Sequence, residues 1–177
     1  MGLVGPNFKA MVEELRAKLV SSTDSARTLG TVRGDAKLLG QQYQEVKVRN
    51  FTIACDEPIS SGGTDKGPTP LDFFVASIGF CENVMFTRNA ALRGLEFDSL
   101  ETSVRGHWDR RGQFEIGGMD PSFKDMIVET KVNTMAPVEK VVEVVRASHR
   151  TCPMRTTIGK AMNVSDRLFV NGQEVSL

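Results

Sequence analysis

The sequence predicts a protein of the α+β class, in which strands and helices occupy separate runs of the chain. Three observations support this prediction. Residues 29–55 alternate apolar and polar side chains roughly in the period of a β-strand. A long apolar run, residues 70–93, begins with residues that typically start a helix. Beyond it, further strand patterns surround a helical pattern that begins at Pro137.

Length and charge limit the classes of function. The 177 residues fit one domain or one two-lobed unit, and the formal net charge is zero. A neutral chain without a long basic run lacks the electrostatic footprint of a protein that binds nucleic acid or anionic lipid. No stretch reads as a membrane helix, and the amino terminus does not read as a signal peptide. We therefore expect no nucleic-acid partner, no membrane partner and a cytoplasmic location.

The first predicted element is an amphipathic helix at residues 8–20. Its apolar residues recur at helical spacing: Phe8, Met11, Leu15 and Leu19. A polar stretch, residues 21–24, ends this helix. We expect residues 1–28 to form an amino-terminal helical extension and residues 29–177 to form the main domain.

Two or three strands and a long loop follow the extension. The strands are expected within residues 29–55, with Gly40 and Asn50 as breaks between them. The loop is expected at residues 56–69, which read DEPISSGGTDKGPT and contain two prolines and three glycines.

The central helix is the most informative element. Thr69 suits a helix cap, Pro70 suits the first helical position, and Asp72 completes a capping box. The residues that follow are apolar on nearly every side, although the run is too short to span a membrane. A helix of this kind is expected to be buried all round, in the middle of the protein or at a subunit interface. Cys81 lies at its centre.

The carboxy-terminal half predicts strands and helices in turn. Gly94 ends the central helix, and Asn171-Gly172 predicts a hairpin with Val175 on its returning strand. The other predicted elements are a strand at 100–108, a polar connection at 110–122, a strand at 123–132, a helix from 137 to about 151, a short helical turn from Cys152-Pro153, and two short strands at 162–164 and 167–170.

The chain has three cysteines, which is too few for a disulfide-stapled scaffold. No pair of them has the spacing of a zinc site, and His107 and His149 show no metal-ligand spacing either. We therefore expect no metal and no bound cofactor. Cys55 ends a predicted strand, and the structural interpretation suits it best. For Asp72 we prefer the role of a helix cap to the role of a general base.

Several motifs together resemble one family. They are Asp56-Glu57-Pro58, the loop from Gly62 to Pro70, the apolar helix with Cys81, and the helix end His149-Arg150-Thr151-Cys152-Pro153. In this order they resemble the OsmC/Ohr superfamily, named for an osmotically induced protein and for organic hydroperoxide resistance. The resemblance covers most of the chain from about residue 31 onward.

The resemblance carries specific expectations. It implies an OsmC-like fold in which antiparallel sheets pack around a buried central helix, and an intertwined homodimer. It also implies a thiol peroxidase that reduces organic hydroperoxides, in which Cys81 attacks the peroxide and Cys152 resolves the product. Such a cycle passes through a sulfenic acid and a disulfide, and an external thiol or dithiol reductant resets it.

The sequence departs from the peroxidases of this family at two positions. Those enzymes use a glutamate just after the proline that opens the central helix, where Leu71 stands here. They also use an early arginine, where this sequence reads Gly40-Gln41-Gln42. Apolar neighbours disfavour ionisation of Cys81, whereas a helix start flanked by Arg150 and Arg155 predicts easier ionisation of Cys152.

Two functions therefore stay open. The first is a dimeric hydroperoxide reductase that uses Cys81 and Cys152. The second is a catalytically weak dimer of the same fold, which senses redox state or holds an apolar small molecule at its interface. Rapid thiol alkylation and turnover favour the first, and slow alkylation with a retained ligand favours the second.

Overall fold

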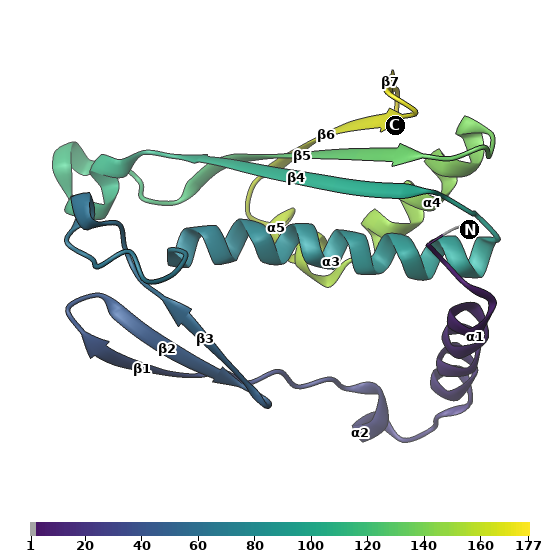
Figure 1. Ribbon diagram of the computed structural model, residues 1–177, viewed down its shortest axis with the longest axis horizontal. Coiled ribbons are helices and arrows are strands. Elements are labelled where there is room, and N and C mark those ends of the chain that lie inside the picture. The colour runs from purple at the N-terminus through teal and green to yellow at the C-terminus, as the bar shows by residue number, and fades with distance from the viewer. Residues whose placement is uncertain (1–2) are drawn as a thin grey trace. The chain divides into compact units, whose positions relative to one another are not determined.

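A computed structural model describes residues 3–177, apart from the side chains of Ser25 and Arg27. The chain divides into two compact units (Figure 1). One unit comprises residues 1–17 together with 75–177, and the other comprises residues 18–74. Within residues 3–177 no helix combines the length and apolarity needed to cross a membrane.

A four-stranded sheet forms one layer of the larger unit. Its strands are β4 (Ser99–Trp108), β5 (Phe123–Asn133), β6 (Asn163–Val170) and β7 (Gln173–Val175), in that order across the sheet. The β4–β5 and β6–β7 pairs are antiparallel, but β5 and β6 run parallel. The α+β class is confirmed, and the expected antiparallel pairing holds for every pair of neighbouring strands among the described residues except β5 and β6. Two helices lie between β5 and β6 in the chain, and such a crossover returns the chain in the parallel direction.

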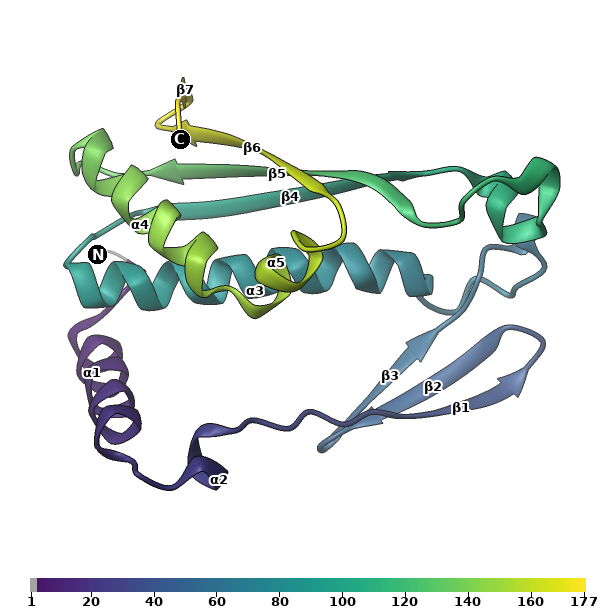
Figure 2. The same cartoon turned by 180° about the vertical axis from the view of Figure 1, so that it is seen from behind.

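The helices of this unit cover one face of the sheet (Figure 2). They are α3 (Pro70–Arg93), of which residues 75–93 belong here, α4 (Val138–Thr151) and the short α5 (Pro153–Ile158). The predicted polar connection contains two short 3₁₀ turns, Arg110–Phe114 and Ile116–Gly118. Most predicted boundaries in this half of the chain are confirmed within one residue.

The core lies between the helices and the sheet. Phe86 of α3 meets Phe97 edge to face, with ring centroids 5.1 Å apart. The core residues around this pair are Ala90, Leu95, Val132, Val141, Val144, Val145, Leu168 and Val170. Each fully buried valine or leucine side chain adds about 1.5–3 kcal/mol to the free energy of unfolding relative to an exposed one. The packing of these core residues therefore holds α3 and α4 on the sheet.

Strand β6 corrects the prediction of two short strands at 162–164 and 167–170. It is one continuous strand, and its exposed and covered residues alternate with a period of two. The polar pair Ser165-Asp166 suggested a break, but Asp166 occupies a covered position of the alternation. A charged residue on a covered face needs a partner, which the site described below supplies.

The start of α3 confirms the predicted capping box. The backbone N–H and the hydroxyl of Thr69 both donate to Asp72 Oδ2, at 2.9 and 2.8 Å, and Asp72 N–H donates back to Thr69 Oγ1 at 3.1 Å. The helix ends at Gly94, which has a φ of 66° and so suits a residue without a Cβ atom.

Within a single chain α3 is not buried all round, so of the two expected locations the middle of the protein does not account for its whole surface, and burial at a subunit interface stays a prediction. Ile78 and Ala90 are fully buried, but Phe80 is 70% exposed and Val84 is 46% exposed. Leu92, which lies on the same side of the helix at a spacing of eight residues from Val84, is 37% exposed. We call Phe80, Val84 and Leu92 the exposed stripe of α3. The sequence pattern cannot distinguish a surface that its own chain covers from one that it leaves open.

The unit of residues 18–74 holds an antiparallel three-stranded sheet. Its strands are β1 (Asp35–Gly40), β2 (Tyr43–Val48) and β3 (Phe51–Cys55), so the upper number of the predicted two or three strands is confirmed. The loop after β3 contains one 3₁₀ turn, Ile59–Ser61. The buried carboxylate of Asp56 organises this loop by accepting hydrogen bonds from Glu57 N–H, Thr64 N–H, Thr64 Oγ1 and Lys66 N–H.

The amino-terminal helix α1 (Pro6–Ser21) confirms the helix predicted at 8–20, and α2 (Ser25–Thr28) follows it. Its apolar residues do not form a buried face. Met11, Leu15 and Leu19 are each about half exposed, and Val12 is the buried residue of the helix.

Candidate active site

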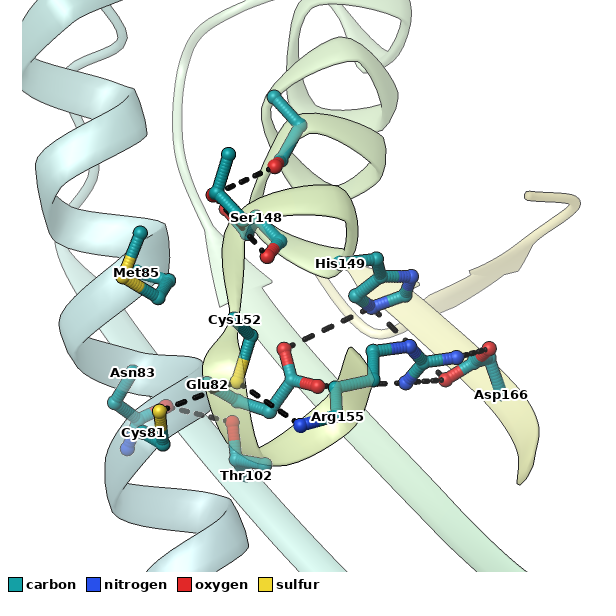
Figure 3. A network of polar contacts seen from close by, with 12 residues as sticks. Cys81, Glu82, Asn83, Met85, Thr102, Ser148, His149, Cys152, Arg155 and Asp166 are labelled. Atoms are coloured by element: carbon teal, nitrogen blue, oxygen red, sulfur yellow. Dashed lines mark hydrogen bonds and ion pairs between the residues drawn. The ribbon is translucent and has the colours of Figure 1, made fainter. Parts of the chain in front are cut away.

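The structure brings the two predicted site cysteines together. Cys81 lies in the middle of α3 and Cys152 lies between α4 and α5, yet their Sγ atoms are 3.2 Å apart (Figure 3). Both are free thiols, and Cys152 is placed to donate its S–H to Cys81 Sγ. Cys152 is completely buried, whereas Cys81 is partly exposed. The pair is therefore close enough to exchange a proton and asymmetric in its access to solvent.

Two helices fix the position of Cys152. Its backbone N–H donates to Ser148 O at 2.9 Å, which closes the last turn of α4. Its side chain caps α5, because Cys152 Sγ accepts a hydrogen bond from Arg155 N–H at 3.5 Å. Pro153 takes the first helical position, where the missing N–H costs nothing. The predicted helix start at Cys152-Pro153 is confirmed.

The predicted easy ionisation of Cys152 is wrong. Burial raises the pKa of the Cys152 thiol to about 12, and the hydrogen bond from Arg155 N–H only partly offsets this rise. The flanking cations do not help: Arg150 is exposed, and the guanidinium of Arg155 binds two carboxylates. Local sequence gives the helix start but not the depth of burial, and burial decides the outcome.

A cluster of ionisable side chains, of which Glu82 is buried and the others are partly buried, adjoins the thiols. The guanidinium of Arg155 donates to both carboxylate oxygens of Asp166, through Nη1 at 2.7 Å and through Nη2. Nη1 also donates to Glu82 Oε1 at 3.4 Å. Glu82 follows Cys81 on α3, and its side chain is 6% exposed. His149 Nε2 lies 3.9 Å from both Glu82 Oε2 and Asp166 Oδ1 (Figure 3).

The charges of this cluster do not favour a thiolate at Cys152. Burial raises the pKa of Glu82, while the neighbouring Arg155 lowers it. Burial and the charge of Arg155 lower the pKa of His149 to about 4, so His149 is neutral at pH 7. One guanidinium then faces two carboxyl groups. The nearby Glu82 carboxylate adds to the effect of burial on the pKa of Cys152.

A small cavity lies next to the charged cluster. Its volume is about 10 Å³, it lies between α3, α4 and the sheet, and its lining includes Glu82, Thr130, Ser148 and His149. That volume is about enough for one water molecule. Cys81 itself is partly exposed, so its thiol is accessible from solvent.

The other residues singled out in the sequence have structural tasks. Cys55 is buried at the end of β3, and Asp72 is the helix cap. Within residues 3–177 no group of three histidine, cysteine or acidic side chains is placed to hold a metal ion.

Reasoning from the sequence missed Glu82 and Asp166 as members of the site. A signal for Glu82 was present, because it is a lone acid within the apolar part of α3 and lies next to Cys81. An acid in such a run needs a buried partner. Asp166 was missed because the sequence predicted a break between two strands at its position. His149 was named as part of the motif at the end of its helix and as a histidine without metal-ligand spacing, but not as a neighbour of these acids.

The comparisons with known proteins agree with the fold and with the order of the motifs. Residues 63–165 match the family model described as OsmC-like protein. Among curated proteins, no sequence match was found.

Several solved structures share the fold. An OsmC-like protein from Mycoplasma pneumoniae superimposes with a TM-score of 0.70 at 14% identity, covering 80% of this chain and 97% of that one. An organic hydroperoxide resistance protein from Legionella pneumophila gives 0.60 at 16%, covering 80% and 98%. The organic hydroperoxide resistance protein OhrB of Bacillus subtilis gives 0.54 at 23%, covering 80% and 98%. The family match spans more than half of the chain, and on this ground the protein belongs to the OsmC-like family.

Proposed function

We propose that this protein is a cysteine-based peroxidase that reduces organic hydroperoxides through a Cys81–Cys152 thiol–disulfide cycle. One observation carries the proposal: a partly exposed thiol and a buried thiol lie 3.2 Å apart. A role in peroxide stress is also supported by the fold, which is shared with proteins described as organic hydroperoxide resistance proteins.

The cycle has three steps. The Cys81 thiolate attacks the peroxide, the O–O bond breaks, and the departing alkoxide takes a proton to give an alcohol and a sulfenic acid. Cys152 then attacks the Cys81 sulfur, and the displaced hydroxide takes the Cys152 proton to give water and a disulfide. An external dithiol reduces the disulfide and is itself oxidised to a disulfide.

The neighbour that favours a Cys81 thiolate in this proposal is Cys152. With a pKa of about 12, Cys152 keeps its proton at neutral pH, and its S–H is placed to donate to Cys81 Sγ. A hydrogen bond to the charged form of a group favours that form. This arrangement compensates for Leu71 and for Gly40-Gln41-Gln42, which stand where the resemblance to family peroxidases leads us to expect activating residues.

Turnover of cumene hydroperoxide with dithiothreitol tests the proposal. The wild-type protein should consume the peroxide, and Cys81→Ser should abolish consumption. Cys55→Ser is the matched control, because Cys55 belongs to the unit of residues 18–74 and should leave turnover unchanged. Wild-type consumption no faster than that of Cys81→Ser would refute the proposal.

A second candidate is a catalytically weak dimer that senses redox state or holds an apolar molecule at its interface. The exposed stripe of α3 favours it, because Phe80 and Val84 flank Cys81 in the sequence and leave apolar surface open. This candidate predicts slow alkylation of Cys81 at neutral pH and an apolar ligand retained through purification. Native mass spectrometry of the purified protein distinguishes the two.

In either case we propose that the working form is a homodimer. Phe80, Val84 and Leu92 leave apolar surface exposed on α3, with exposed Arg88 between Val84 and Leu92, while most other residues of the helix are at least partly covered. A second copy of the chain would cover such a surface and restrict the approach to Cys81.

A further inference from the structure

Arg155 connects the surroundings of the two thiols. Its backbone N–H donates to Cys152 Sγ at 3.5 Å, and its guanidinium donates to Glu82 Oε1 at 3.4 Å. Glu82 follows Cys81 directly on α3. Arg155 is therefore bonded to Cys152 through its backbone and to the neighbour of Cys81 through its side chain. These contacts tie α5 to α3 beside the 3.2 Å approach of the two sulfur atoms.

Asp166 fixes the orientation of the guanidinium. Both Nη atoms of Arg155 donate to the two oxygens of this carboxylate. A two-point contact of this kind restrains the plane of the guanidinium as well as its position, which a lysine ammonium does not do. Asp166 lies on a continuous strand that pairs with β5 along its whole length. The sheet thus provides a rigid support for Arg155.

The short helix α5 needs such a support. It has six residues, and isolated helices of this length are unstable in water. Its orientation must therefore come from tertiary contacts, of which Arg155 and the buried Ile158 are two. Buried ion pairs add little net stability, because desolvation offsets their attraction. The main effect of these contacts is therefore to fix the position of the first turn of α5, and with it the position of Cys152.

We propose that Arg155, held by Glu82 and Asp166, is a positioning residue that keeps Cys152 Sγ within attack distance of the Cys81 sulfur. This inference rests on the proposed function and concerns its second step. There Cys152 Sγ forms a bond to the Cys81 sulfur, the S–O bond of the sulfenic acid breaks, and the hydroxide leaves as water with the Cys152 proton. We call Arg155 with Glu82 and Asp166 the clamp. The first step uses Cys152 only as a hydrogen-bond donor to Cys81, so loss of the clamp should slow it less than the second step, in which Cys152 forms the new bond.

The test separates the two steps in one turnover. Reduced protein is mixed with one equivalent of cumene hydroperoxide, quenched with dimedone at successive times, and analysed by mass spectrometry. Arg155→Lys keeps the charge but loses the two-point contact, and Arg155→Ala loses both. Arg146→Lys is the matched control, because Arg146 is an exposed arginine of α4. In both Arg155 variants the disulfide should form more slowly by about tenfold or more, and the dimedone adduct of Cys81 should accumulate.

In the Arg155 variants, loss of reduced Cys81 should slow clearly less than disulfide formation does, and Arg146→Lys should behave as wild type in both steps. Disulfide formation at the wild-type rate in Arg155→Lys, or equal slowing of both steps, would overturn the proposal. If Arg155→Ala does not fold, Arg155→Lys and Glu82→Gln decide the matter, since Glu82→Gln should also slow disulfide formation.

A second oxidant distinguishes failure of the clamp from failure of the peroxidase. Diamide takes up the two hydrogens of a dithiol and so forms the disulfide without a peroxide. If cumene hydroperoxide leaves the wild-type thiols intact, the peroxidase proposal fails. The clamp is then supported by slower disulfide formation with diamide in Arg155→Lys, and it is refuted by equal rates in wild type and variant.

Discussion

Cys152 Sγ lies 3.2 Å from Cys81 Sγ, and the two thiols occupy opposite environments. Cys152 is completely buried and has a pKa raised to about 12, whereas Cys81 is partly exposed. The buried thiol is placed to donate a hydrogen bond, and the partly exposed thiol is accessible from solvent. The depth at which the fold places each thiol therefore distinguishes the two residues.

The first prediction concerns the hydrogen bond between these thiols. Cys152→Ala removes the donor, whereas Cys152→Ser keeps one in nearly the same place. Alkylation of Cys81 by iodoacetamide at pH 7 should therefore be several-fold slower in Cys152→Ala than in Cys152→Ser. Second-order rate constants measured for both variants in a Cys55→Ser background check this. Identical rate constants for the two variants would show that Cys152 does not assist Cys81.

The second prediction concerns His149 and the pH dependence of stability. In the folded protein its pKa is lowered to about 4 by burial and by Arg155, against the attraction of Asp166, and Glu82 also lies near it. As the pH falls, His149 therefore takes up a proton near pH 6.5 in the unfolded chain but only near pH 4 in the folded chain. Folded stability should be fully present above pH 6.5 and should fall as the pH drops towards 4.

Urea denaturation of His149→Gln checks this prediction. The variant lacks a titrating imidazole, so its free energy of unfolding should fall less than that of the wild type between pH 7 and pH 4, by up to about 3 kcal/mol. Protonation of Glu82, whose pKa burial raises, acts in the opposite direction and is common to both proteins. Parallel curves for wild type and variant over this range would contradict the assignment.

Much of the fold could be predicted because the local signals and the tertiary contacts agree. The capping box of Thr69 and Asp72 forms as its spacing indicates, and Asn171 and Gly172 both take the positive φ that a tight hairpin turn needs. The parallel pairing of β5 and β6 could not be derived in the same way. It depends on where two helices return the chain, which no residue within either strand specifies.

The site was predictable in its cysteines but not in its electrostatics. Cys81 and Cys152 were found because motifs mark their positions, and the fold does bring them together. The state of Cys152 was not predictable, because its pKa depends on burial by residues that are distant in sequence. Glu82 and Asp166 form their site only through a third residue, Arg155, from yet another element.

The third prediction concerns Gly63 in the loop after β3. A Cβ atom at this position would lie 1.8 Å from the carbonyl oxygen of Glu57, so the backbone itself would have to move. Gly63→Ala should therefore lower the free energy of unfolding by about 2–4 kcal/mol. Gly40→Ala is the matched control, because no atom lies within 4 Å of the added Cβ, and its effect should stay within about 0.5 kcal/mol. Equal effects of the two substitutions would show that the loop can relax.

The fourth prediction concerns the exposed stripe of α3. If a second copy covers this stripe, a charge placed on it would be buried without a partner, which costs several kcal/mol and should prevent association. Phe80→Glu should therefore give a monomer at concentrations where the wild type is a dimer, as measured by light scattering during size-exclusion chromatography. Ser103→Glu adds the same charge at an exposed position of β4 and should leave the dimer intact. A wild-type monomer, or a dimer that persists in Phe80→Glu, would mean that the stripe serves another purpose. The ligand-binding candidate would then gain support, because the apolar surface beside Cys81 would still need an occupant.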